Sequence, residues 1–366
     1  LTGSWTKRDY NSNASGNYYA NPFYITRYMA PVYPLFMHNA DGTYQLDADG
    51  NKIYDTTSSY LSNRNIAYEM LYNKQESVRN VLGGQAFATI SLPYGLSLTV
   101  KGDLNNSTSN NKKYDNPEIG DGATNGGRLT SYAYQYKTVT LQEILSWNYQ
   151  FNQVHNVEAM VAHENYSWER KYTSGMNTGM AVDGNLTMGN FLNNSYFSGS
   201  DDEDKTESYL ARVKYNYDNR YLADVVCSYS GSLKMPVGDK YRVYPAVSVA
   251  WIASNEEFMH RFSVLDYLKL RASFGVTGND SRLFYDMDKQ FNGPGQEYIF
   301  VGTTSTGGLA QGGFPSKGIE PEKEYKANFG VEVGIWKGLS MQVDAFYNRR
   351  KNIRQYAGGV YSSVVG

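Results

Sequence analysis

The chain has 366 residues, of which 34 are Lys or Arg and 36 are Asp or Glu, and its formal net charge is −2. This balance argues against a protein that binds nucleic acid through phosphate contacts, because such a protein needs a basic surface. The single cysteine, Cys227, excludes an intramolecular disulfide framework and a multi-cysteine zinc site. The mean hydropathy is −0.56, yet 15% of the residues are aromatic and 34 of them are tyrosine. Because disordered chains lack aromatic residues, we expect a folded protein.

The sequence begins at Leu1, with neither an initiator methionine nor an apolar leader segment. No apolar run approaches the roughly 18 residues that a membrane-spanning helix needs. We therefore expect an internal piece of a longer protein, in which case the lack of a targeting signal carries no information about localisation.

Apolar and polar residues alternate along much of the chain, a pattern typical of β-strands with one apolar face. In the clearest example, Tyr209, Ala211 and Val213 share one face, and Leu210, Arg212 and Lys214 share the other. Matching this pattern predicts about eleven strands. Their expected spans are 1–9, 78–93, 96–108, 136–152, 155–172, 205–217, 220–233, 241–253, 267–279, 323–336 and 339–353. Several reach the roughly 9–11 residues that a tilted strand needs to cross a bilayer.

The connections between these strands alternate between tight turns and long polar segments. The tight turns are 93–95, 153–154, 218–219 and 337–338, and the long segments are 10–77, 109–135, 173–204 and 280–322. Two connections are less clear: 234–240 is short but falls on the long-loop side, and 254–266 reads as a short helix on the tight-turn side. Because one side of the sheet has short turns and the other long loops, the sequence predicts an antiparallel transmembrane β-barrel with short periplasmic turns and long extracellular loops.

Aromatic residues gather at the strand ends near the tight turns, where outer-membrane barrels carry a girdle at the membrane–water interface. Examples are Trp147, Tyr217 and Trp251. Packing of these rings near hairpin turns is the alternative explanation. Glu143 and His163 interrupt otherwise apolar tracks, which predicts either a shift of register or a bulge in those strands.

Several stretches resemble SusC/RagA-like TonB-dependent outer-membrane transporters. They are 21–24 (NPFY) running into 27–34 (RYMAPVYP), 209–215 (YLARVKY) followed by 219–222 (NRYL), 244–251 (YPAVSVAW) with 257–259 (EFM), and 268–279 (LKLRASFGVTGN). The resemblance covers most of the chain and is strongest over 205–280. It implies a barrel of about 22 strands that encloses an N-terminal plug.

The resemblance also implies outer-membrane import of oligosaccharides or peptides, energised through TonB, with a SusD-like surface lipoprotein as the lid. The plug, the TonB-contacting segment and the first and last strands have no counterpart in this sequence. Residues 1–366 are therefore expected to form a partial barrel domain that supplies part of the wall and the extracellular loops. An incomplete barrel leaves strand edges whose backbone groups need partners, so the chain alone should aggregate or depend on the missing strands.

No catalytic constellation stands out, and we expect no enzyme activity, no resident metal and no cofactor. His163-Glu164 lacks the second histidine of a zincin motif. The segment 47–51 (DADGN) resembles part of a calcium-binding loop. Its glycine is misplaced, however, and no bidentate glutamate follows at the required position, so an Asp-Gly turn is favoured. The acidic run 201–204 indicates a solvated loop, with a surface cation site as the alternative. Cys227 is expected to be inert.

Ligand contacts are instead expected in the loops, because loops on a rigid barrel commonly carry them. The candidate substrate-binding residues combine flat rings with one guanidinium, and they are Tyr18, Tyr19, Tyr24, Arg27, Tyr28 and Tyr285. Packing of the loop on its neighbours is the alternative for each of them. A secreted or surface β-rich adhesin or carbohydrate-binding module is the second functional hypothesis, and a β-sandwich hydrolase is the third.

Overall fold

The computed structural model describes residues 1–10, 21–30, 32–57, 64–235, 238–262, 264–280, 291–300, 304–311, 320–336 and 338–353. These residues form an antiparallel sheet of eleven strands in the order β1-β2-β3-β4-β5-β6-β7-β8-β9-β12-β13. The strands are β1 (Thr2–Tyr10), β2 (Lys74–Ser91), β3 (Leu96–Asp115), β4 (Arg128–Phe151), β5 (His155–Met180), β6 (Phe191–Tyr217), β7 (Tyr221–Ser232), β8 (Tyr241–Ile252), β9 (Leu265–Asn279), β12 (Glu322–Ile335) and β13 (Leu339–Lys351). All eleven strands that the alternation predicts are present, so the all-β, partial-barrel prediction is confirmed.

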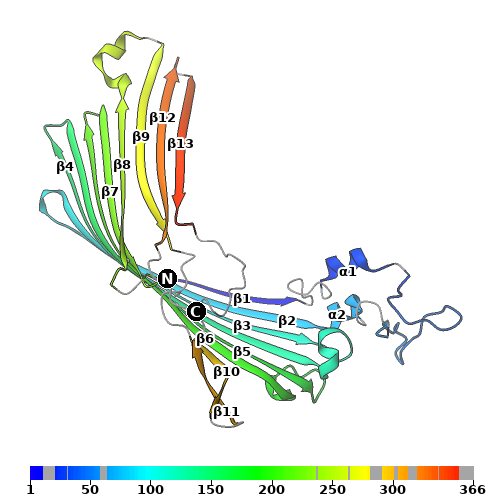
Figure 1. Cartoon of the computed structure of the whole chain (residues 1–366). Coiled ribbons are helices and arrows are strands. Elements are labelled where there is room, and N and C mark those ends of the chain that lie inside the picture. The colour runs from blue at the N-terminus through cyan, green and yellow to red at the C-terminus, as the bar shows by residue number, and fades with distance from the viewer. Residues whose placement is uncertain are drawn as a thin grey trace. The chain divides into compact units, whose positions relative to one another are not determined.

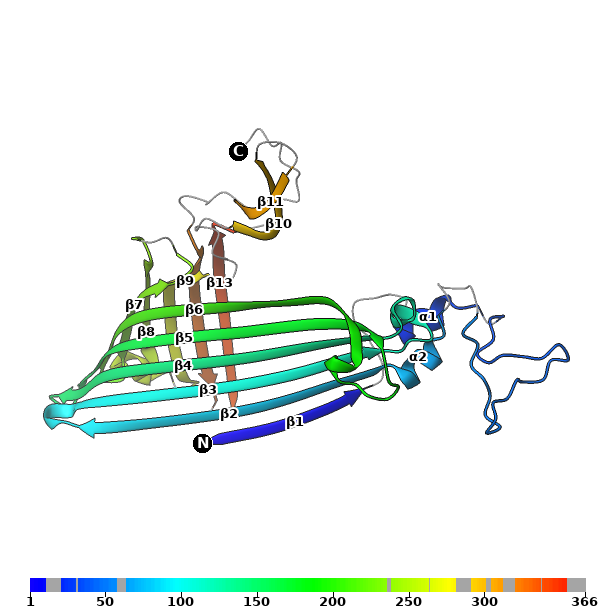
Figure 2. The ribbon, with the colours of Figure 1, turned by 90° about the horizontal axis from the view of Figure 1, so that it is seen from below.

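Sequence neighbours pair throughout the sheet except where β9 pairs with β12. Figure 2 shows β1 to β6 side by side, and Figure 1 shows β7, β8, β9, β12 and β13 following in the same manner. The register across β6, β7 and β8 aligns Tyr217 with Tyr221 and Tyr221 with Trp251. The predicted girdle residues at these strand ends therefore lie in one row.

The predicted tight turn at 218–219 has the backbone that a short hairpin requires. Asp218 and Asn219 have φ of 49° and 52°, the left-handed conformation that a type I′ turn needs at both central residues. Asp and Asn adopt it more readily than other residues because their short polar side chains bond locally. The 93–95 turn is a 3-10 turn, η2 (Pro93–Gly95).

The chain divides into two compact units. Unit 1 comprises Leu1–Gly84, Leu104–Thr138 and Trp168–Glu203, and unit 2 comprises Gln85–Asp103, Val139–Ser167 and Asp204–Gly366. Strands β2 to β6 contribute residues to both. Because side chains alternate across a strand, each unit carries two faces of sheet.

In unit 2 one face is apolar. On β6, β7 and β8 it carries Val213, Val225 and Val247, whose exposed fractions are 49%, 52% and 44%. We call this the apolar face, and the opposite face, which carries Arg212 and Asp224, the polar face. Exposed aliphatic side chains that continue across neighbouring strands indicate a surface that meets something other than water.

The structure differs from the predicted elements in four places. Strands β3 to β6 extend far into the expected long loops 109–135 and 173–204, where polar residues on both faces hide the alternation. A hairpin of β10 (Phe291–Phe300) and β11 (Thr304–Gln311) lies within the expected 280–322 loop. The 254–266 connection forms two 3-10 helices, η5 (Ala253–Asn255) and η6 (Glu257–Arg261), in place of one short α-helix. The 10–77 segment contains α1 (Pro22–Tyr28) and α2 (Ile66–Tyr72).

Among the described residues, no helix has the length and hydropathy needed to cross a bilayer.

Candidate functional site

Three of the six predicted ligand-contacting residues lie together on α1. The helix starts at Pro22, and the side chain of Asn21 caps it by accepting hydrogen bonds from the backbone of Phe23 and Tyr24. The rings of Tyr24 and Tyr28 stack with centroids 4.4 Å apart, as residues four apart on a helix can. Arg27 is exposed beside them. Tyr18, Tyr19 and Tyr285 lie outside the described residues, so the predicted cluster stays a prediction.

A buried ionic network joins α2 to the connection between β3 and β4 within unit 1. Arg64 donates to Glu69 at 3.0 Å and also pairs with Asp121. Arg128 donates to Asp115 at 2.8 and 2.6 Å. Figure 2 shows α2 beside the strand ends where this connection lies. The network fixes α2 and the adjoining Arg64 to the connection between β3 and β4.

Glu69 is the most perturbed group of this network. Its side chain is 4% exposed, and its Oε1 has no hydrogen-bond partner among the residues that the structure describes. Burial raises the pKa of the Glu69 carboxyl to about 7, although the charge of Arg64 acts in the opposite direction. Gly120, with φ of +80°, lies so close that a Cβ atom there would approach Glu69 Oε2 to 2.6 Å. The tight packing leaves the carboxyl little room for compensating water.

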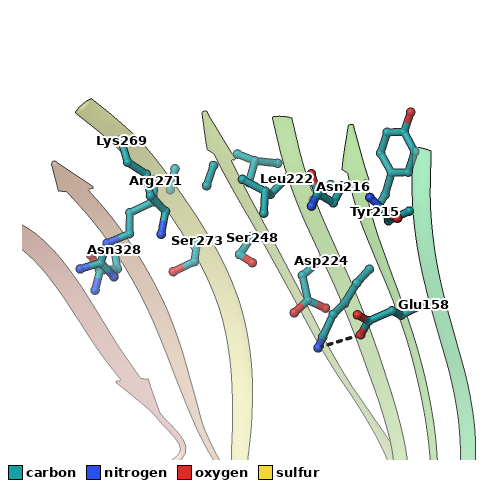
Figure 3. A pocket seen from close by; sticks show the side chains of 16 residues that line it. Glu158, Tyr215, Asn216, Leu222, Asp224, Ser248, Lys269, Arg271, Ser273 and Asn328 are labelled. Atoms are coloured by element: carbon teal, nitrogen blue, oxygen red, sulfur yellow. Dashed lines mark hydrogen bonds and ion pairs between the residues drawn. The ribbon is translucent and has the colours of Figure 1, made fainter. Parts of the chain in front are cut away.

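The polar face of unit 2 is hollowed into a pocket of about 600 Å³. Figure 3 shows side chains of its lining, such as Glu158, Asp224 and Arg271, projecting from neighbouring strands. The Nζ of Lys214 lies 3.2 Å from Glu158 Oε2. Polar and charged residues supply most of the lining, including Glu158, Lys214, Asp224, Lys269, Arg271 and Asn328. Such a lining suits water or a polar ligand and does not suit lipid.

Opposite charges on this face largely neutralise one another across the strands. Arg212 donates through Nε to Asp224 at 3.0 Å. Arg271 lies 3.2 Å from Glu332 and donates to Asp344 at 2.7 Å. Cross-strand pairs of this kind stabilise a sheet. They also leave this face of unit 2 with little net charge.

A row of polar side chains crosses the apolar face of unit 2. His163 Nδ1 lies 3.0 Å from Glu143 Oε2, and His163 Nε2 lies 3.2 Å from Glu207 Oε1. The hydroxyls of Tyr209 and Tyr241 both donate to Glu207. We call these five residues the His163 row. On this face Glu143 and His163 are partners of each other, and the register shift or bulge expected at these two residues stays a prediction.

Among the described residues, no group of histidine, cysteine or carboxylate side chains is arranged to hold a metal ion. The carboxylate of Asp47 instead accepts hydrogen bonds from the backbone of Asp49 and Asn51, which closes a turn. In the acidic run 201–204, Asp202 is bonded to Arg170 and Asp204 lies 2.7 Å from Lys234. Both carboxylates thus serve ion pairs.

Comparison with protein-family models gives no match. Over 82% of its length the chain is 24% identical to TonB-dependent receptor P3 and 26% identical to TonB-dependent receptor P39, both of Formosa agariphila. A shorter stretch of 74 residues is 31% identical to TonB-dependent receptor SusC of Bacteroides thetaiotaomicron. The chain spans 29% and 28% of the length of the first two relatives.

Two solved structures share the fold at low sequence identity. The RagAB peptide transporter matches 87% of the chain with a TM-score of 0.71 and 17% identity, over 36% of its own chain. The RagAB peptide importer in its closed-closed state matches 83% with a TM-score of 0.72 and 18% identity, over 33% of its own chain.

The fold and the two-faced sheet define a stretch of wall from an outer-membrane β-barrel. The resemblance to SusC/RagA-like TonB-dependent transporters is confirmed by these relatives and structures. All of them are named as receptors or transporters, in line with the expectation that the chain is not an enzyme.

Proposed function

We propose that the chain forms part of the barrel wall of a TonB-dependent importer that carries nutrients such as oligosaccharides or peptides across the outer membrane. The observation that carries this proposal is the contrast between the two faces of unit 2. The apolar face presents Val213, Val225 and Val247 in adjacent strands, whereas the polar face behind them holds the 600 Å³ pocket. A barrel with a lipid-facing exterior and a polar lumen requires this arrangement.

The dimensions of the apolar face agree with a bilayer. On β8, Tyr241 of the His163 row and Trp251 lie ten residues apart. Trp251 pairs with Tyr221, which lies beside the 218–219 turn. Ten residues of strand span about 33 Å, and a tilt of about 40° reduces this to about 25 Å along the membrane normal. That height matches the apolar band of outer-membrane barrels. The His163 row then marks the outer border of the band, and the aromatic residues near the turns mark the inner border.

The partners follow from the same proposal. The plug and the TonB-contacting segment belong to the part of such a protein outside this chain. A SusD-like lipoprotein covers the extracellular side, where α1 and α2 lie. The RagAB transporter is named for peptides. For this chain the proposal includes two classes of cargo, oligosaccharides and peptides.

The test is nutrient uptake by the bacterium that carries the full-length gene. Deleting the gene should abolish growth on a subset of purified oligosaccharides or peptides, and deleting TonB should have the same effect. Complementation with the full-length gene should restore growth in the first strain only. Unchanged growth on every nutrient, or recovery of the protein in the soluble fraction, would contradict the proposal and favour the secreted adhesin or carbohydrate-binding module.

A further inference from the structure

A second polar surface lies in unit 1, on the same sheet face that carries Arg170. Four aromatic rings from two strands form a continuous row there. Tyr134 and Tyr136 of β4 stack with centroids 6.0 Å apart and planes inclined by 6°. Tyr134 lies 4.7 Å from Tyr172 of β5, and Tyr136 lies 6.3 Å from Trp168 of β5, between ring centroids. We call these four residues the ring row.

A pocket of about 480 Å³ adjoins the ring row and reaches across β1, β2, β3 and β4. Its lining consists of Thr6, Arg8, Gln75, Ser77, Arg79, Ser109, Asn111, Tyr132 and Tyr134. The pairing of β1 with β2 sets Arg8 opposite Ser77 and Thr6 opposite Arg79. The volume falls within the range of small-ligand sites.

Hydrogen bonds hold part of this lining in place. Ser77 donates to Asn111 Oδ1 at 2.6 Å, and the Arg79 Nε donates to Ser107, which is buried, at 3.1 Å. Side chains fixed by such contacts lose less entropy when a ligand binds.

The charge of the pocket is unbalanced. It contains two arginines and no acidic side chain, and within the described ranges neither Arg8 nor Arg79 forms an ion pair. Arg170, by contrast, is bonded to Asp202 at 2.9 and 2.6 Å. Guanidinium groups without a carboxylate partner favour an anionic ligand, and their planar fork fits a carboxylate with two parallel hydrogen bonds.

The remaining lining identifies the rest of the ligand. The Thr6 hydroxyl and the Gln75 amide can each donate and accept hydrogen bonds, as a ligand rich in hydroxyls requires. The Ser109 hydroxyl donates to Asn111 at 3.3 Å and is left to accept. The flat rings of Tyr132 and Tyr134 offer apolar faces on which the C–H face of a sugar ring can pack. No aliphatic side chain is among the described residues that line the pocket, so the apolar side chains of a peptide would find no matching surface.

We propose that this pocket and the ring row bind an acidic oligosaccharide, with Arg8 and Arg79 holding carboxylate groups and the rings supporting successive sugar units. The inference rests on the proposed import function and names its substrate class.

The experiment measures binding to the purified full-length protein in detergent by calorimetry, which needs neither TonB nor transport. The probes are tetragalacturonate and a hyaluronan tetrasaccharide, with maltotetraose as the neutral sugar and tetraglutamate as the acidic peptide. Arg8→Gln and Arg79→Gln should each weaken binding of an acidic sugar about ten-fold or more, since each removes a charge-assisted contact. Lys7→Gln is the matched control, because it removes a positive charge from the next position of β1, on the opposite face, and should leave affinity unchanged.

Binding of an acidic tetrasaccharide with this dependence on Arg8 and Arg79 supports the proposal. Equal binding of maltotetraose, tighter binding of tetraglutamate, or no binding of either acidic sugar overturns it. A failure of the proposed import function is detected separately: the deletion strain would then grow normally on every nutrient, irrespective of the binding measured by calorimetry.

Tyr134→Leu supplies a second test, because it keeps an apolar side chain while removing the flat ring. This variant should weaken binding of acidic sugars and leave heat-modifiable migration on SDS gels unchanged.

Discussion

His163 Nδ1 lies 3.0 Å from Glu143 Oε2 between neighbouring strands, on a face of unit 2 that is otherwise apolar. The second ring nitrogen reaches Glu207, so one imidazole connects two carboxylates. At the border of an apolar band this pairing satisfies groups that would otherwise meet hydrocarbon unpartnered, at a cost of several kcal/mol each.

Replacing His163 by Leu should destabilise the barrel more than an ordinary surface substitution. Glu143 loses the imidazole that it contacts, and Glu207 keeps the hydroxyls of Tyr209 and Tyr241. The expected loss of unfolding free energy is about 1 to 3 kcal/mol, the cost of leaving a polar group without its partner. Urea unfolding of the full-length protein in lipid vesicles, followed by tryptophan fluorescence, measures it.

The triple variant Glu143→Leu/His163→Leu/Glu207→Leu is the control for this prediction. Replacing a whole ionic group by apolar residues is often neutral or stabilising, so its stability should exceed that of the single variant. A triple variant less stable than His163→Leu would show that the row acts in another way.

Gly231 provides space for Tyr241. A Cβ atom at residue 231 would approach the Tyr241 ring to 2.7 Å, and this ring carries the hydroxyl that donates to Glu207. Gly231→Val should therefore displace the ring and cost about 1 to 3 kcal/mol of unfolding free energy, despite the β-propensity of valine. At Gly102, also within a strand, a Cβ atom would meet no other atom within 4 Å, so Gly102→Ala should be tolerated in the same urea assay. Equal costs at both sites would contradict the steric explanation.

Val225 and Val226 are adjacent on β7 and lie on opposite faces, Val225 on the apolar face and Val226 opposite Arg212 on the polar face. A lysine at the centre of the apolar band costs about 2 to 4 kcal/mol, whereas the lumen tolerates charge. Val225→Lys should thus sharply lower the amount of heat-modifiable barrel in outer-membrane fractions. Val226→Lys should leave most of the heat-modifiable barrel in place. If Val226→Lys lowered its amount more than Val225→Lys does, the lipid-facing and lumen-facing sides would have to be exchanged.

Glu69 predicts a pH dependence outside the membrane-spanning strands. Its pKa is raised from 4.5 to about 7, so between these values the folded state binds more protons than the unfolded state. The stability of the folded state therefore falls as pH rises through this window. Hydrogen exchange in α2, corrected for the intrinsic effect of pH, should show less protection at the upper end than at the lower end.

Glu69→Gln is the control for the pH experiment. The amide keeps the size of the side chain but cannot ionise, so protection in α2 should become nearly independent of pH across the same window. Asp41, an exposed residue whose pKa is lowered by hydrogen bonds from Thr43, serves as the matched site: Asp41→Asn should leave the pH dependence of α2 unchanged. A pH response that persists in Glu69→Gln would assign it to another group.

The alternation of side chains is sufficient to locate the strands of the sheet, because one face of each is apolar where it crosses the bilayer. Beyond that zone both faces are polar, as in 105–113 of β3, and the signal that separates strand from loop disappears. The pairs of the polar face depend on register. The observed register sets Arg212 opposite Val226 and Lys214 opposite Asp224, so Arg212 reaches Asp224 diagonally. A two-residue connection at 218–219 would pair residue 217 with residue 220 and place Asp224 on the other face from Arg212, so this pair could not be predicted from the sequence.

The ring row and its pocket could not be predicted in the same way. Tyr134 and Tyr172 lie on strands joined by a tight turn, but the alternation places Tyr134 in a long loop and Tyr172 at a strand end. Loop tyrosines such as Tyr24 and Tyr28 are the stronger candidates for ligand contacts on that basis. The extension of β4 and β5 beyond the apolar band is what brings the rings together.

The most direct test of the barrel-wall assignment is a cysteine scan along β7 in the full-length protein. The native Cys227 supplies one of the labelled positions, and it is replaced by serine when another position carries the label. Ser228, the next residue, lies on the other face. Spin labels at each residue from Ala223 to Tyr229 report their exposure to oxygen, which concentrates in lipid, and to a water-soluble nickel complex. We expect a strict period of two, with labels at 225 and 227 in lipid and labels at 226 and 228 in water. Uniform exposure to water along β7 would contradict the claim that this chain is the wall of an outer-membrane barrel.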